Sequence, residues 1–173
     1  MTRFPMSLDA VNGLANDAFV EAFGDIAEHS PWVAAKAAKA RPFADRRAMS
    51  EAFLDAVFDA GEPERLALLR AHPDLAGRAA IAGDLAPDSR REQSGAGLDR
   101  LTPEEFARFT ALNNAYREKF GFPFILAVKG VDKHGILKSF AERLGNDPEA
   151  EFFAAIRQVG RIIAFRLEDR VLS

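Results

Sequence analysis

Hydrophobic residues recur three or four positions apart along almost the whole chain, which is the spacing of one face of an α-helix. In the last third of the chain five apolar residues keep this period: Phe152, Ile156, Val159, Ile163 and Leu167. No segment alternates apolar and polar residues as a half-buried strand would. The pattern predicts an all-α protein of about eight helices, and the length of 173 residues favours a single compact domain over residues 1–173.

Helix-capping residues divide this pattern into separate helices. Ser7 and Asp45 each stand before a periodic run and are typical N-cap residues. The segment Thr102–Glu105 combines a cap, a first-turn proline and a capping-box glutamate, and predicts a helix that ends at Gly121. We expect this helix to bury one side, formed by Phe106, Phe109, Leu112, Tyr116 and Phe120. Further helix starts are predicted near Asn16, Ser30, Pro63, Asp132 and Asp147.

The least regular stretch is a polar segment near residues 83–97, which contains Pro87 and three glycines. A loop or short broken helices there would suit a binding site. Just upstream, Pro73 interrupts the helical pattern. Because the residue before a proline avoids the α conformation, His72 is expected at a helix end, and Asp74 is expected to start another short helix.

Composition and charge narrow the classes of function. The net charge is −3 and the chain has no long basic run, which argues against nucleic acid or an anionic membrane as a partner. The absence of cysteine excludes disulfides and thiolate chemistry. The longest apolar run, residues 122–128, is far shorter than the roughly 20 residues that span a bilayer. No secretory pattern opens the chain, so a cytoplasmic protein is expected.

The side chains best suited to chemistry gather in two short segments, residues 71–77 and 89–98. The first contains His72, and the second adds Glu92 together with a hydroxyl, an amide and two guanidinium groups. A lone histidine in a helical protein is more often a surface or hydrogen-bonded core residue, and this alternative stays open for His72. For His29 and His134 it is the preferred interpretation. With no HExxH motif and no carboxylate cluster of metal-binding spacing, no metal site is expected.

These segments resemble the 2-oxo-4-hydroxy-4-carboxy-5-ureidoimidazoline (OHCU) decarboxylase family. The matching motifs follow in order: HSPWVA at 29–34, HPDLAG at 72–77, SRREQ at 89–93 with AGL at 96–98, YREKFGFPFI at 116–125, and Arg166-Leu167. They extend over almost the whole chain, from about residue 7 to about residue 170. Each motif is modest alone, and together they make a specific signature.

The resemblance implies an all-helical, homodimeric, cofactor-free enzyme of urate degradation. Its substrate would be an anionic ureidoimidazoline, and its product (S)-allantoin. By position in the motifs, His72 would be the catalytic acid or base and Glu92 its carboxylate partner. The substrate contacts implied in the same way are Pro73, Ser89, Arg90, Arg91, Gln93, the backbone segment Phe124, Ile125, Leu126, Ala127 and Val128, and Arg166.

The residue types suit this reaction. The ring C=N bond of the substrate can accept the electron pair left by departing carbon dioxide, so no cofactor is needed. An unperturbed imidazole titrates near neutral pH, so the side chain of His72 is suited to carry a proton. Two alternatives stay open: a helical ligand-binding or interaction module without turnover, and a hydrolase of ureido compounds, which would need a metal or an activated nucleophile.

Overall fold

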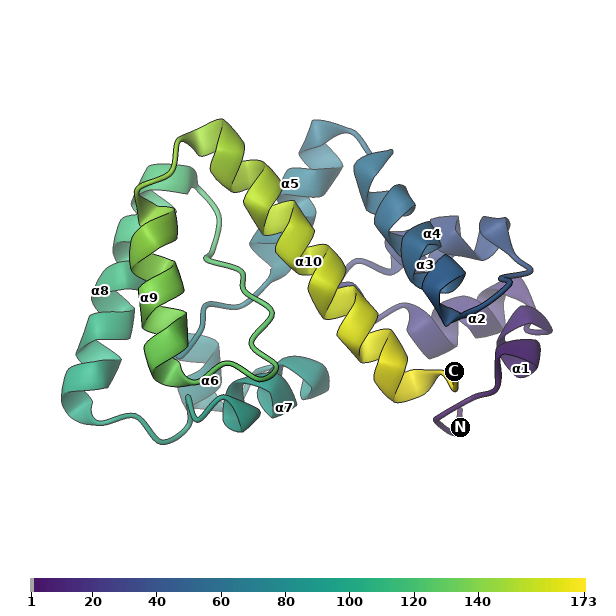
Figure 1. Cartoon of the computed structure of the whole chain (residues 1–173), viewed down its shortest axis with the longest axis horizontal. Helices are drawn as coiled ribbons and strands as arrows, with labels where there is room; N and C mark the ends of the chain where they lie inside the picture. Colours follow the sequence, from purple (N-terminus) through teal and green to yellow (C-terminus); the bar gives the residue numbers. More distant parts are fainter. Residues whose placement is uncertain (1) are drawn as a thin grey trace. The chain divides into compact units, whose positions relative to one another are not determined.

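The computed structural model describes residues 2–173, and its regular secondary structure is helical (Figure 1). These residues form ten α-helices and one short 3-10 helix, without a strand. One isolated parallel bridge joins the two ends of the described chain, where Met6 N–H donates to the Arg170 carbonyl at 2.8 Å and Leu172 N–H donates to the Met6 carbonyl at 2.9 Å. The all-α prediction is confirmed, with two helices more than the eight or so expected.

The helices group into two compact units. The first comprises residues up to 71 together with 160–173, and the second comprises residues 72–159. The last helix, α10 (Pro148–Arg170), contributes residues to both units. The single-domain organisation of residues 1–173 stays a prediction.

The first unit begins at the capping residues that the sequence indicated. The Ser7 hydroxyl accepts the Ala10 N–H at 3.2 Å, and the Asp45 carboxylate accepts the Ala48 N–H at 2.7 Å. Its fully buried core includes the ring of Phe53. The helices of this unit before α10 are α1 (Leu8–Asn12), α2 (Asn16–Phe23), α3 (Pro31–Ala37), η1 (Ala38–Ala40), α4 (Arg46–Phe58) and α5 (Glu62–Ala71).

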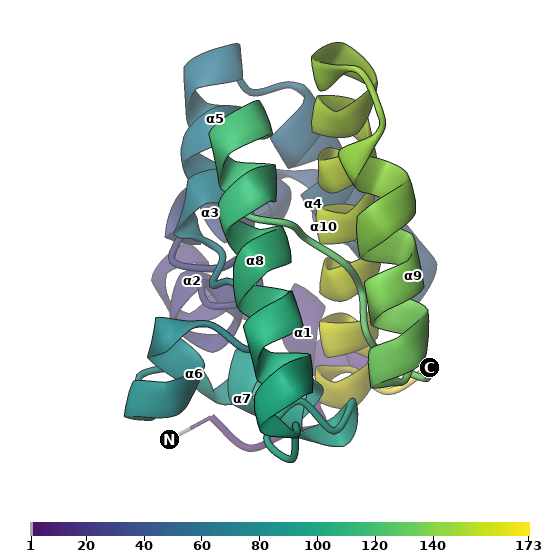
Figure 2. The ribbon, with the colours of Figure 1, turned by 90° about the vertical axis from the view of Figure 1, so that its left-hand side faces the viewer.

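The second unit contains α6 (Arg78–Ala82), α7 (Pro87–Gly95), α8 (Pro103–Phe120), α9 (Lys133–Leu144) and the first turns of α10. The capping box at Thr102 and Glu105 starts α8, and Gly121 ends it at φ 78°, a left-handed conformation that favours glycine. The predicted extended segment, residues 122–128, returns the chain to the start of α9. Consequently α8 and α9 lie side by side and run in the same direction (Figures 1 and 2).

The inward face of α8 differs from the prediction at two positions. Phe106 is about one-third exposed (36%), whereas Asn113 is buried next to the fully buried Phe109 and Tyr116. Asn113 is buried because its amide N–H donates to the backbone carbonyl of Leu75 at 2.9 Å. This side of α8 therefore packs on the HPDLAG loop and not only on apolar side chains.

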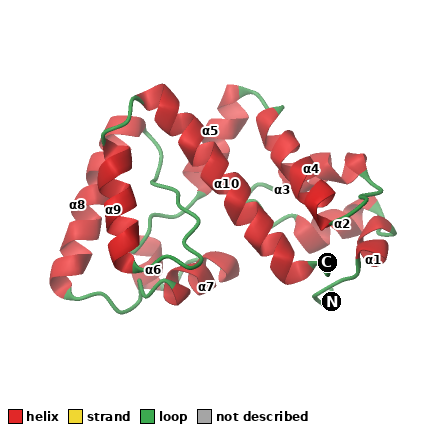
Figure 3. Cartoon of the chain, viewed as in Figure 1, coloured by secondary structure: helices red, strands yellow, loops and turns green. Residues whose placement is uncertain are grey.

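The segment between residues 72 and 97 is also arranged differently from the prediction (Figure 3). A regular helix, α7, occupies much of the stretch where a loop or broken helices were expected, and Pro87 stands in its first turn. The short helix expected at Asp74 instead begins at Arg78. Ala76 has a φ of 52°, which no right-handed helix can contain, so the chain stays irregular until residue 77.

Candidate active site

The histidine-bearing segment, residues 72–77, is an irregular loop that directly follows α5. His72 is buried at the start of this loop. Ala76 holds a left-handed conformation that residues other than glycine adopt at a cost. Gly77 lies so close to Asp74 that a Cβ at position 77 would be 2.7 Å from the Asp74 Cβ. The loop is therefore tightly packed and locally strained, as functional loops often are.

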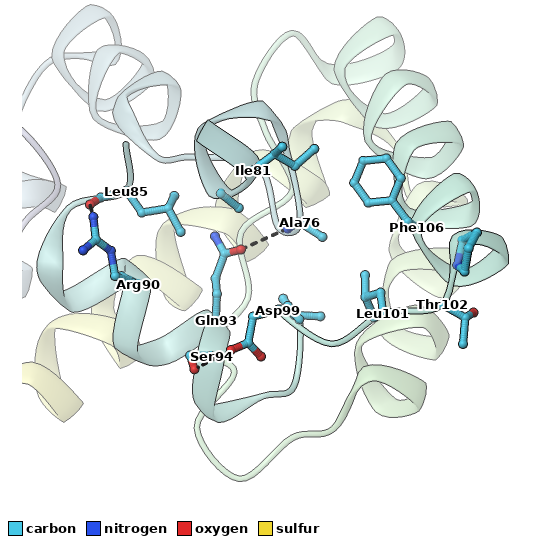
Figure 4. A pocket seen from close by; sticks show the side chains of 13 residues that line it. Ala76, Ile81, Leu85, Arg90, Gln93, Ser94, Asp99, Leu101, Thr102 and Phe106 are labelled. Atoms are coloured by element: carbon cyan, nitrogen blue, oxygen red, sulfur yellow. Dashed lines mark hydrogen bonds between the residues drawn. The ribbon is translucent and has the colours of Figure 1, made fainter. Parts of the chain in front are cut away.

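Gln93 of α7 attaches this loop to the second chemistry-bearing segment. Its amide oxygen accepts the Ala76 N–H at 3.0 Å (Figure 4), and its amide nitrogen donates to the Asp74 carbonyl at 3.2 Å. Gln93 is itself buried. Two hydrogen bonds from one side chain thus pair the buried Ala76 N–H and the half-buried Asp74 carbonyl, and they hold the strained residue in place.

Two residues of α8 hold the same loop, in addition to Gln93 of α7. Besides the Asn113 bond to Leu75, the guanidinium of Arg117 pairs with the Asp74 carboxylate at 2.9 Å. Three side chains from two helices therefore hold residues 74–76 of the loop in shape.

Helix α7 also carries the predicted carboxylate, Glu92. Ser89, Glu92 and Gln93 share one face of the helix because they are three and four positions apart. Ser89 and Gln93 are buried, and Glu92 is half-buried. Gln93, the residue next to Glu92, is therefore hydrogen-bonded to the loop that begins at His72. The direct meeting of the imidazole and the carboxylate stays a prediction.

The two arginines of α7 have partners within their own neighbourhood. The Arg90 guanidinium donates to the backbone carbonyl of Gly83 at 2.7 Å and to that of Leu85 at 3.5 Å. Arg91 pairs with Asp88, three positions earlier on the same helix. In this structure both side chains support α7 and the turn before it, and their predicted contact with substrate remains untested.

Arg166 belongs to the first unit and is deeply buried there. Its guanidinium pairs with the buried carboxylate of Glu28 at 3.0 Å and donates to the carbonyl of Ile26 at 3.1 Å. A buried guanidinium held by a carboxylate is fixed in orientation and fully charged. Its role as a substrate-facing arginine stays a prediction.

The predicted substrate segment, residues 124–128, is extended and mostly buried. The ring of Phe124 belongs to the core, where it stacks on Phe140 with ring centres 3.9 Å apart. The carbonyl of Ile125 accepts a hydrogen bond from Arg143 at 2.5 Å, and the Ala127 N–H donates to the Gln158 amide oxygen at 3.0 Å. The backbone of this segment is thus fixed by side chains on α9 and α10.

Two pockets flank the loop within the second unit. The first, about 610 Å³, lies between α6, α7 and the start of α8, and Ile81 and Phe106 point into it (Figure 4). Of the predicted site residues it includes Arg90 and Gln93. The second, about 700 Å³, includes Pro73. Neither of these two pockets is lined by His72 or Glu92.

Within residues 2–173, the His, Asp and Glu side chains form no group of three or more that could hold a metal ion. None of the helices in that range combines the length and apolar composition needed to cross a bilayer.

Comparison with known proteins decides the family. The sequence model of OHCU decarboxylase matches residues 12–168. The chain belongs to the OHCU decarboxylase family. It is similar to the 2-oxo-4-hydroxy-4-carboxy-5-ureidoimidazoline decarboxylase of Haloferax volcanii, with 41% identity over 97% of this chain and 98% of that protein. The decarboxylase of Mus musculus is 40% identical over 95% of this chain and 92% of that protein.

Solved structures agree with this assignment. The chain is similar to a crystal structure of (S)-allantoin synthase, with a TM-score of 0.76 and 31% identity over 94% of this chain. It spans about half of that longer protein, 53% of its length. A crystal structure of OHCU decarboxylase with (S)-allantoin has a TM-score of 0.66 at 20% identity, which supports the fold alone. The resemblance to OHCU decarboxylases and the enzyme class, a carboxy-lyase, are thus confirmed.

Sequence reasoning missed the residues that hold the OHCU decarboxylase motifs in shape. Asn113 and Arg117 on α8 anchor the HPDLAG loop, and Arg143 anchors the extended segment. One signal was present in the sequence: Asn113 stands on the apolar face of α8, between Phe109 and Tyr116. A polar residue at such a position must find a partner, since an unpaired buried amide is costly.

Proposed function

We propose that this protein decarboxylates OHCU to (S)-allantoin without a cofactor. The observation that carries the proposal is the link made by Gln93, which joins the loop beginning at His72 to the helix bearing Glu92. This link occurs in a chain that belongs to the OHCU decarboxylase family over residues 12–168. His72 and Glu92, to which the motifs assign proton transfer, therefore belong to two segments that are joined by hydrogen bonds.

The chemistry of OHCU explains why such a site would suffice. The carboxylate is carried by a ring carbon that also bears a hydroxyl and adjoins a C=N bond. When the bond to the carboxylate breaks, its electron pair moves into the C=N system and the ring nitrogen takes up a proton. The hydroxyl then loses its proton as a carbonyl forms, and the carbon bearing the ureido group gains one. The ring itself holds the charge, so the protein supplies orientation and proton transfer.

We assign proton transfer to His72, because an imidazole changes charge near neutral pH. In this proposal Glu92 either takes the hydroxyl proton or orients the imidazole and favours its charged form. Delivery of the carbon-bound proton to one face of the ring gives a single enantiomer, (S)-allantoin. The hydroxyl of Ser89 and backbone groups of residues 124–128 match the alternating donors and acceptors of the ureido and imidazoline edge.

The test uses OHCU made in the cuvette from urate by the two preceding enzyme activities, because the compound is unstable. The protein should produce (S)-allantoin faster than the spontaneous reaction, which gives the racemate, and optical rotation follows the product. His72→Ala should lose about 10²–10⁴-fold in kcat/KM, the usual contribution of general acid–base catalysis. His134→Ala, on the exposed side of α9, is the matched control and should keep the wild-type rate.

The remaining outcomes separate the alternatives. Folded protein that binds allantoin but does not accelerate the reaction would indicate a binding module. Loss of activity with EDTA would indicate a metal-dependent hydrolase, whereas the decarboxylase should be insensitive to chelation. The proposal also includes a homodimer in the cytoplasm, and light scattering on the purified protein should give twice the monomer mass of 18.9 kDa.

A further inference from the structure

A buried ionic cluster in the second unit lies beside the predicted substrate segment, and no step of the proposed reaction uses it. Its centre is the carboxylate of Glu151, which is fully buried in the first turns of α10. One carboxylate oxygen accepts from the Tyr116 hydroxyl at 2.5 Å and from Arg143 Nε at 2.8 Å. The other accepts from the Asn146 amide at 2.9 Å. Such complete pairing is what a buried carboxylate requires.

Arg143 connects this cluster to the extended segment. Its Nη1 donates to the Ile125 carbonyl at 2.5 Å, and its guanidinium carbon lies 4.5 Å from the centre of the Phe124 ring. That ring is stacked on Phe140. The guanidinium is thus held by Glu151 on one side and by an aromatic face on the other, so it has little freedom to move.

The hydrogen bond between Arg143 and the Ile125 carbonyl also fixes the direction of the next N–H group, that of Leu126. The Ile125 carbonyl and the Leu126 N–H belong to one planar trans peptide and point in opposite directions. A carbonyl held by Arg143 therefore turns the Leu126 N–H away from the guanidinium. Within residues 2–173 this N–H has no hydrogen-bond acceptor, whereas the next one, of Ala127, is bonded to Gln158.

We propose that Arg143 is a positioning residue of the active site, which orients the Ile125–Leu126 peptide so that the Leu126 N–H donates to an oxygen of the bound OHCU. The inference rests on the proposed function. The state of the cluster at neutral pH supports it, since burial and the hydrogen bond to Glu151 raise the pKa of Tyr116 and keep its hydroxyl a neutral donor. The Tyr116 hydroxyl therefore stays a hydrogen-bond donor to Glu151 at the pH where the enzyme would work.

Arg143→Lys tests the role without removing the charge beside Glu151. An ammonium group is a single point and cannot reproduce the planar fork that reaches Glu151 and Ile125 together. The variant should lower kcat/KM about tenfold, the loss expected for one hydrogen bond to the substrate. Most of the loss should appear as a higher KM, because the N–H would contact the substrate before and during the reaction.

Tyr116→Phe is the matched control. It removes one donor from the same buried carboxylate while leaving the contacts of Arg143 with Glu151 and Ile125 in place. It should lower the melting temperature and leave KM close to the wild-type value. A second readout does not depend on turnover: in ¹⁵N-labelled protein saturated with (S)-allantoin, the Leu126 amide resonance should shift in the wild type and in Tyr116→Phe, but not in Arg143→Lys.

The outcomes separate this inference from the proposed function. Wild-type protein that fails to accelerate OHCU decarboxylation overturns the proposed function. If the wild type is active but Arg143→Lys keeps the wild-type KM and the Leu126 amide shift, only the positioning role is overturned. The same conclusion follows if both variants lose activity in proportion to their loss of melting temperature, because the cluster would then serve stability only.

Discussion

At the scale of single residues, Gln93 has a structural task that its place in the family motif does not reveal. The motif assigns it to the substrate, whereas its amide is hydrogen-bonded to Ala76 and Asp74 of the loop that follows His72. A residue of this kind supports catalysis through the backbone it holds. Removing it should therefore affect stability as well as activity.

Gln93→Leu should lower the free energy of unfolding by about 1–3 kcal/mol, because the buried Ala76 N–H loses its acceptor and finds no water. Urea unfolding followed by circular dichroism measures the change. Ser94→Ala is the control, since Ser94 is the exposed neighbour on α7 and its hydroxyl donates to the exposed Asp99, and it should change stability by less than about 0.5 kcal/mol. Equal stability of the two variants would contradict the anchoring role of Gln93.

At the scale of elements, the helices were predictable and the loop that carries His72 was not. Helix starts are encoded locally: Ser7, Asp45, Thr102 and Asp132 each accept a backbone N–H three residues later. The loop shape instead depends on Gln93, Asn113 and Arg117, which stand about 20 to 40 positions further along the chain. No local pattern in residues 72–77 contains that information.

The close packing inside this loop makes Gly77 sensitive to a single added carbon. Gly77→Ala would bring a Cβ to 2.7 Å from the Asp74 Cβ, so the loop must shift. We expect a loss of about 1–3 kcal/mol in unfolding free energy, typical of overpacking. Because the loop begins at His72, kcat/KM should also fall by up to about 10²-fold.

Gly95→Ala, at the end of α7, is the control for this substitution. Nothing lies within 4 Å of the added carbon, and alanine is the better helix former, so thermal unfolding should show unchanged or slightly raised stability. If the two substitutions proved equally harmless, the loop would be able to rearrange without cost, and its packing would not fix the position of His72.

At the scale of the whole molecule, two carboxyl groups link stability to acid pH. The hydrogen bonds that the Glu105 carboxylate accepts from Lys133 and Thr102 lower the pKa of Glu105 to about 2. For Asp25, burial acts to raise the pKa, but the hydrogen bond and charge of Arg170 outweigh it and the pKa is lowered. In both cases folding favours the ionised carboxylate over the protonated form.

The sign of the pH dependence follows from these lowered pKa values. The stabilisation is complete above the ordinary pKa of about 4.5 for Glu105, and it is lost as the pH falls towards 2. The melting temperature should therefore be level near neutral pH and should fall below about pH 4.5. Glu105→Gln should flatten this fall, whereas Glu104→Gln, outside the Thr102 and Lys133 contacts, should keep the wild-type curve. An unchanged slope in Glu105→Gln would contradict the linkage.

The backbone bridge between Met6 and Val171 places residues 6 and 171 next to each other in the first unit. An insert whose ends are this close does not force its host loop apart when it is spliced into another protein. Residues 6–171 are therefore suited to domain insertion into a surface turn of an unrelated host protein, with a short linker on each side.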